Sequence, residues 1–189
     1  MSRPDHVALM ARYNRWMNER LYRAAAALPA AELARDRGAF FGSILGTLNH
    51  LLVADLIWLR RFGAAPGAHP LLAQLQSMPV PPTLDATLFD RLDALAAARE
   101  RMDALVEAWT GALDETALAT PLRYRNTAGK TFERETFGLL MHLFNHQTHH
   151  RGQVTTLLSQ AGVDMGVTDL LALLPVADAP AADDGTHPH

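Results

Sequence analysis

One stretch decides how this chain folds, because it combines helical periodicity with an unusual density of histidine: residues 139–153 read LLMHLFNHQTHHRGQ. Four of the nine histidines of the chain lie in it. Leu139 and Leu143, with Val154 and Leu157 just beyond, continue one helical face in both directions. That face is predicted to turn toward the core, and it also carries histidines.

The spacing of two histidines in this stretch would let both bind the same metal ion. At ~100° per residue, His146 and His150 lie ~40° apart and one turn along the axis, so both imidazoles can reach one ion. His142 and Gln153 fall on the same face. Three residues fall opposite: Phe144, Thr148 and Arg151. Imidazoles on a core-facing surface need a physical reason, and shared metal binding is one.

The same apolar periodicity recurs elsewhere and predicts four long helices, over residues 5–28, 43–63, 84–113 and 135–160. Ser43 is a suitable N-cap for the second helix, and Gly162 a suitable C-terminal cap for the last. The sequence therefore predicts an all-α four-helix bundle, a fold whose core often houses metal sites.

Two segments interrupt the helical pattern. Residues 63–82 hold five prolines and predict a loop or a broken short helix. Between Thr120 and Glu135 the period becomes alternating around Thr127-Ala128-Gly129, which is typical of a β-hairpin. We expect this short hairpin to be inserted before the last long helix.

The composition limits the remaining possibilities. A chain of 189 residues can form one domain, which we place at residues 1–175, with 176–189 as a disordered tail rich in Ala, Asp and Pro. Because cysteine is absent, metal ligands must be nitrogen or oxygen. No apolar stretch reaches the ~20 residues of a membrane span, and no signal peptide is recognisable. We expect a cytoplasmic protein with no membrane partner.

The charge pattern argues against nucleic-acid binding. The formal net charge is −3, and the seventeen lysines and arginines are scattered along the chain. A nucleic-acid reader needs a basic stripe that neutralises phosphates. We therefore expect no nucleic-acid partner.

His50 is the strongest candidate for a third ligand, since it lies in the apolar second helix. Its neighbours one turn away, Gly46 and Ala54, would leave room around a ring. Three histidines with a fourth position open to water is the arrangement of catalytic zinc sites. The competing interpretation is that His50 is a hydrogen-bonded core residue without a metal.

The other polar residues of the last helix are assigned supporting roles. His142 and His149 are predicted to lie in the second shell or at the surface. If either bound the metal, the set of ligands would have to be displaced along the helix. Gln153 either lines the pocket or bonds a neighbouring group. We expect its amide to point toward the open coordination position.

These residues resemble the DinB-like family of bacterial four-helix-bundle metalloproteins, which is unrelated to the DNA polymerase of the same name. The resemblance spans about residues 8–175. Its carriers are Tyr13-Asn14-Arg15-Trp16, Leu48-Asn49-His50 with Ala54-Asp55 and Trp58, and, most specifically, residues 145–153.

The resemblance implies that His50, His146 and His150 bind zinc or nickel, often in a homodimer, and that relatives act with low-molecular-weight thiols. Gln147 replaces the glutamate base of His-Glu-x-x-His proteases, which disfavours peptide hydrolysis. Thiol-dependent S-transfer or simple hydrolysis of a small-molecule substrate stays open. The alternatives are a metal-binding stress-response module and a dimeric interaction module, both without catalysis.

Overall fold

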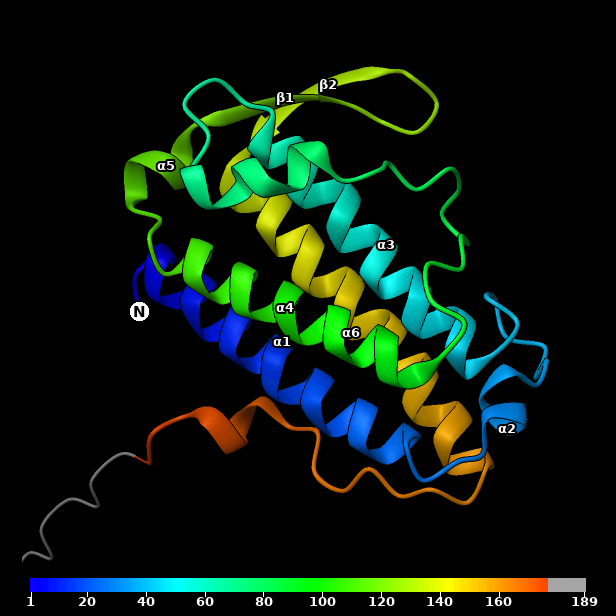
Figure 1. Cartoon of the computed structure of the whole chain (residues 1–189). Coiled ribbons are helices and arrows are strands. Elements are labelled where there is room, and N and C mark those ends of the chain that lie inside the picture. Colours follow the sequence, from blue (N-terminus) through cyan, green and yellow to red (C-terminus); the bar gives the residue numbers. More distant parts are fainter. Residues whose placement is uncertain (177–189) are drawn as a thin grey trace, which may run out of the picture.

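Four long helices form the main body of the described chain: α1 (Arg3–Ala25), α3 (Ile44–Gly63), α4 (Leu92–Thr110) and α6 (Thr136–Gln160). In this computed structural model, which describes residues 1–176, α1 and α3 each pack against both α4 and α6 (Figure 1). An antiparallel hairpin of β1 (Pro121–Arg125) and β2 (Thr131–Glu135) directly precedes α6. The prediction of an all-α fold with this hairpin is confirmed. The predicted tail lies, apart from Val176, outside the described residues.

Capping residues define the ends of these elements. Ser2 and Asp5 form a reciprocal capping box at the start of α1, and the Ser43 side chain accepts a hydrogen bond from the Gly46 amide at the start of α3. Gly129 in the hairpin turn and Gly162 after α6 have φ of +78° and +80°. Both glycines therefore have the left-handed backbone that such a turn and such a cap require.

Short helices fill the connections between the long ones. The predicted proline-rich loop contains η1 (Pro70–Ser77), which packs on α3 through Leu72 and Leu75. Three further short helices were not predicted: α2 (Ala30–Ala34), α5 (Glu115–Ala119) and η2 (Leu170–Leu173). The chain after α6 runs back along α1, where the Tyr13 hydroxyl donates to the Thr168 carbonyl at 2.6 Å.

The predicted start of the third long helix at Leu84 is wrong, because α4 begins only at Leu92. Side chains of α3 bind the backbone of the preceding segment. The Asn49 carboxamide oxygen accepts hydrogen bonds from the amides of Leu88 and Phe89, both at 2.9 Å. Its nitrogen donates to the Phe89 carbonyl, also at 2.9 Å. These bonds hold residues 88–89 in a non-helical conformation against α3.

None of the helices within residues 1–176 combines the length and the apolarity that crossing a bilayer would require.

The interior contains a buried ionic network in addition to its apolar core. Arg99 of α4 pairs with Asp55 of α3 at 2.6 Å and with Asp103 of its own helix at 2.9 Å, and all three residues are at most 3% exposed. Asn14 and Asn18 of α1 donate to the Asp103 carboxylate at 3.1 and 2.9 Å. Charged groups without water need such partners.

The last long helix joins the same network. Gln147 donates to the Asp55 carboxylate at 2.5 Å and to the Leu51 carbonyl at 3.1 Å. Arg151 donates to the Asn14 side chain. The side of α6 opposite its histidines is therefore also buried, with Phe144 and Arg151 each 2% exposed. The network connects all four long helices.

Removing one partner of the buried pair should strongly destabilise the fold. Asp55→Ala removes one of the two carboxylates that neutralise the buried Arg99 guanidinium. We therefore expect the free energy of unfolding to fall by ~3–5 kcal/mol. Urea denaturation of the metal-free protein measures this loss. Arg91→Ala, which breaks the exposed Arg91–Asp93 pair, is the matched control and should change stability little. Similar losses in both variants would contradict a dominant role for the network.

Candidate metal site

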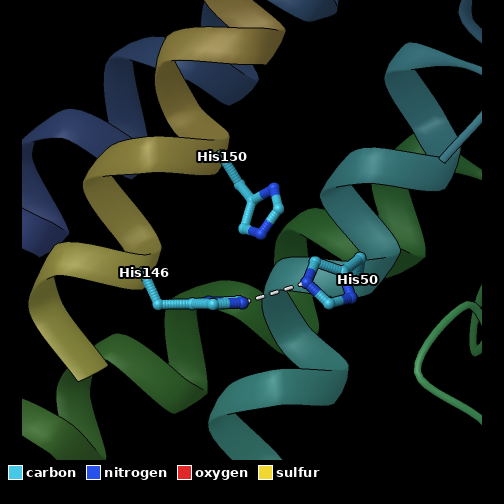
Figure 2. Close-up of side chains that lie close together, drawn as sticks. All are labelled: His50, His146 and His150. Carbon is cyan, nitrogen blue, oxygen red and sulfur yellow. Dashed lines mark hydrogen bonds between the residues drawn. The ribbon is translucent and has the colours of Figure 1, made fainter. Parts of the chain in front are cut away.

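Three imidazoles converge between two facing helices. His146 and His150 extend from α6 toward α3, and His50 extends from α3 toward them (Figure 2). One nitrogen of each lies within 4.8 Å of the others. Within residues 1–176 this group contains these three histidines and no carboxylate. We call it the imidazole cluster.

The spacing of the cluster suits a metal ion. The Nε2 atoms of His50 and His146 are 3.1 Å apart. Two nitrogens bound at ~2.0–2.1 Å to a tetrahedral zinc ion stand about 3.3 Å apart. This pair would therefore need only a small adjustment, and three imidazole nitrogens are a donor set that suits a divalent transition metal with one position left open.

Hydrogen bonds to the outer ring nitrogens orient two of the three imidazoles. Nδ1 of His50 lies 2.7 Å from the Leu84 carbonyl oxygen, which can only accept, so this nitrogen carries the proton. The lone pair of His50 is consequently on Nε2, which faces the cluster. In ligating histidines, a hydrogen bond of this kind at the nitrogen remote from the metal fixes the tautomer of the ring.

Gln153 plays the corresponding part for His150. Its Oε1 lies 2.7 Å from Nδ1 of His150, and its Nε2 lies 3.4 Å from Nε2 of His149. The amide is therefore engaged with two histidines, whereas the sequence led us to expect it to point at the open coordination position.

An aromatic ring that was not predicted covers one side of the cluster. Phe41 stacks on His50 with ring centroids 3.7 Å apart and meets the edge of His150 at 5.4 Å. Its backbone sits against α3: a Cβ at Gly46 would stand 2.2 Å from the Phe41 carbonyl oxygen. Gly46, expected to leave room around the His50 ring, thus leaves room for the loop that carries Phe41.

The two remaining histidines of α6 lie outside the cluster. His149 is exposed, and its ring centroid is 4.7 Å from that of His150. His142 is one turn before His146, at 6.1 Å between ring centroids, and packs against Trp58 at 5.1 Å.

Burial keeps the clustered histidines neutral. It lowers the pKa of His146 to about 3, and the neighbouring rings of His150 and His50 add to the effect. Burial also lowers the pKa of His50 and of His150, against the opposing hydrogen bonds to Leu84 and Gln153. Neutral imidazoles are the form that binds metal.

The sequence pattern singled out the three clustered histidines and Gln153, but not Phe41 or the Leu84 carbonyl. Phe41 lies in the loop before α3, so no helical spacing in the sequence relates it to His50. The Leu84 carbonyl is a backbone group in a segment predicted to be helical. Asn49, next to His50, is a polar residue in an otherwise apolar helix. Its presence there could have indicated that a loop is hydrogen-bonded to this helix.

The fold and the cluster together define a helical protein with a candidate three-histidine metal site. The chain belongs to the DinB family, whose sequence model matches residues 1–183. It is similar to Protein DinB of Bacillus subtilis (strain 168), with 28% identity over 167 residues that cover 87% of this chain and 91% of the relative.

The lowered pKa values predict an acid-sensitive metal-free protein. Below the ordinary histidine value of ~6.5 the unfolded chain binds more protons than the folded chain, so stability falls as pH drops from ~6.5 toward ~3. Each such histidine contributes at most about 1.4 kcal/mol per pH unit. Urea denaturation with a chelator at about pH 7 and about pH 5 measures the loss, which should be smaller in His146→Asn.

His149→Asn is the matched control for this measurement, because His149 is exposed on the same helix and lies outside the cluster. It should keep the pH dependence of the parent protein. An unchanged pH dependence in His146→Asn would show that His146 is protonated as readily in the folded as in the unfolded chain.

Proposed function

We propose that this chain is a metal-dependent enzyme in which His50, His146 and His150 hold one zinc or nickel ion. The observation that carries the proposal is the convergence of three neutral imidazoles from two helices, with no fourth histidine or carboxylate in the group within residues 1–176. Closed structural zinc sites have four protein ligands, whereas catalytic sites have three and an open position.

The reaction class follows from the chemistry of the surroundings. A bound metal would act as a Lewis acid and lower the pKa of a water or thiol at the open position. Gln147 cannot serve as a base, since its amide is neutral and bonded to Asp55 and Leu51 in the core. We therefore favour thiol-dependent S-transfer or simple hydrolysis of a small molecule over peptide hydrolysis.

The residues around the cluster have separable tasks in this proposal. The Leu84 carbonyl and the Gln153 amide accept hydrogen bonds from the outer nitrogens of His50 and His150, so the Nε2 atoms of both rings would be left to bind the ion. The Phe41 ring excludes water from the side of His50 and His150. Part of His146 is exposed, whereas His50 and His150 are buried, so a substrate would approach from the side of His146.

A non-catalytic module is the second candidate function. Phe40 is 84% exposed on the loop beside the cluster, and its ring lies 4.9 Å from that of Phe41. An exposed aromatic ring at this place favours contact with another protein surface, including a second copy of the chain in a homodimer. In that case the metal would stabilise the loop and its partner surface instead of activating a substrate.

Metal content tests the ligand set directly. Each of His50→Ala, His146→Ala and His150→Ala should abolish stoichiometric metal, because a site with two imidazoles binds weakly. Elemental analysis of untagged protein purified without a nickel column gives the readout. His149→Ala should retain the metal, since this exposed histidine lies outside the cluster.

Gln153→Ala tests the group that orients the His150 ring. Loss of a group that orients a ligating histidine commonly weakens metal affinity about 10- to 100-fold. We expect such a loss in chelator competition, and restoration by Gln153→Glu, which keeps an acceptor for His150. Full metal occupancy in His50→Ala would exclude the proposed ligand set.

Turnover separates the enzyme from the non-catalytic module. The metal-loaded protein should convert at least one member of a panel of small electrophiles and hydrolysable esters, offered with and without a low-molecular-weight thiol. The activity should disappear with the metal in His146→Ala and persist in His149→Ala. A metal-loaded protein without turnover on the panel, but with metal-dependent self-association in ultracentrifugation, would favour the module.

A further inference from the structure

A pocket away from the imidazole cluster opens between α3, α4, η1 and the segment that joins η1 to α4, and we call it the η1 pocket. At ~100° per residue, its wall residues Leu52 and Leu56 stand ~160° and ~120° around α3 from His50. The volume of the pocket is about 440 Å³, and ligand-binding pockets measure ~300–1,000 Å³. The η1 pocket is therefore large enough for a small molecule and separate from the candidate metal site.

The interior of the η1 pocket is apolar, and its rim is exposed. Its wall consists of Leu52, Leu56, Gln74, Leu75, Met78, Pro79, Leu88, Phe89, Ala98, Arg101, Met102 and Leu105. Four of these residues come from three elements and are at most 7% exposed: Leu52, Leu56, Leu75 and Met102. Pockets that bind small molecules combine such an apolar interior with a few polar groups that orient the ligand.

Hydrogen bonds from α3 hold the first movable wall of the pocket in place. The Arg60 guanidinium donates to the carbonyl groups of Leu75 and Met78. The Gln76 side chain in turn donates to the Arg60 carbonyl at 3.1 Å. The end of η1 is therefore fixed to α3 by polar contacts in addition to the packing of its leucines.

The second movable wall is fixed in the same way. Leu88 and Phe89 are bound through their backbone groups to the Asn49 side chain of α3. Apolar side chains pack closely wherever their segments are free to approach one another. Because α3 holds both segments by specific hydrogen bonds, the η1 pocket is preformed and does not depend on a ligand to open it.

Arg101 is the one charged residue in the wall of the η1 pocket. It is exposed, and within residues 1–176 it has no ion pair. The residues one turn away from it on α4 are all apolar: Ala97, Ala98, Ala104 and Leu105. The rim therefore offers a guanidinium to an anion beside an apolar interior, and no wall residue carries a negative charge.

The shape of the side chains favours a flexible hydrocarbon over a flat ring. Phe89 is the one aromatic residue of the wall, and the other apolar residues are leucine, methionine, alanine and proline. Methionine has three rotatable bonds and adapts to irregular apolar groups. Met78 at the rim and Met102 in the interior could both adjust to such a chain.

We propose that the η1 pocket binds an aliphatic carboxylate, with the hydrocarbon chain against the leucines and methionines and the carboxylate group at the Arg101 guanidinium. This site is separate from the imidazole cluster, and its ligand needs no metal ion. The proposal therefore goes beyond the proposed function and does not depend on it.

Calorimetric titration of the full chain with hexanoate, octanoate and decanoate tests the apolar interior. Each additional buried CH₂ group should raise the affinity about three- to fourfold, until the chain exceeds the pocket. Ala98→Phe, which places a ring in the pocket, should weaken decanoate binding at least about tenfold. Ala97→Phe is the matched control, because Ala97 is exposed on the same helix and lies outside the pocket.

Decylamine, which has the same chain as decanoate's hydrocarbon part with a positive charge, tests the role of Arg101. We expect Arg101→Gln to weaken decanoate binding about two- to fivefold, the range of an exposed ion pair, and not to weaken decylamine binding. Arg101→Lys should restore part of the loss. Arg12→Gln is the control, since Arg12 is an exposed arginine of α1 outside the pocket.

Methyl NMR of protein with ¹³C-labelled methionine methyl groups locates the ligand. Decanoate should shift the signals of Met78 and Met102, which line the pocket, and leave those of Met10 and Met141 in place. Circular dichroism of each variant establishes that it is folded before its affinity is compared.

The outcomes separate this inference from the proposed function. Shifts of all four methionine signals alike would indicate adsorption to the surface and would overturn the assignment of the pocket. An Arg101→Gln variant that binds decanoate like the parent protein would overturn the role of Arg101. Stoichiometric zinc without decanoate binding would overturn the η1 pocket alone, whereas decanoate binding in a protein that takes up no zinc would overturn the metal-dependent function alone.

Discussion

The buried pairing of Arg99 with Asp55 and Asp103 is the constraint on which the rest of the structure depends. These charges lie at most 3% exposed, and the partners that satisfy them come from all four long helices. A shift of α3 along α6 by one turn would separate Asp55 from Gln147 and leave polar groups unpaired in the interior. The network therefore favours a single register, and that register places His50 opposite His146 and His150.

Different interactions thus place the three imidazoles of the candidate metal site. The ionic network sets the relative position of the helices, while the Leu84 carbonyl and the Gln153 amide set the orientation of individual rings. Phe41 adds a third element, because its loop is fixed by close contact with Gly46. The ring nitrogens are therefore held in place by the protein itself, which would reduce the entropy lost if an ion bound there.

The long helices, the hairpin and the three clustered histidines were predictable because each carries a local pattern. Helical spacing identified the face of α6 that bears His146 and His150, and alternation around Gly129 identified the hairpin. Arg99 and Asp103 were not recognised, since charged residues in an amphipathic helix ordinarily face solvent and their partners are distant in sequence. The helix start at Leu84 was wrong for the same reason: local periodicity contains no information about the Asn49 side chain that binds this segment from another helix.

The way residues 84–89 are bound to α3 has a consequence for how such a chain can change in evolution. The Nδ1–H group of His50 donates to the Leu84 carbonyl, and the neighbouring Asn49 side chain binds the backbone of Leu88 and Phe89. Because these hydrogen bonds fix residues 84–89, sequence changes in the exposed stretch just before Leu84, which includes Val80 and Pro82, should not move the His50 ring. Loop closure becomes only slowly less favourable with length, so insertions there cost little free energy. The molecule can acquire new surface beside the site while the imidazoles keep their places.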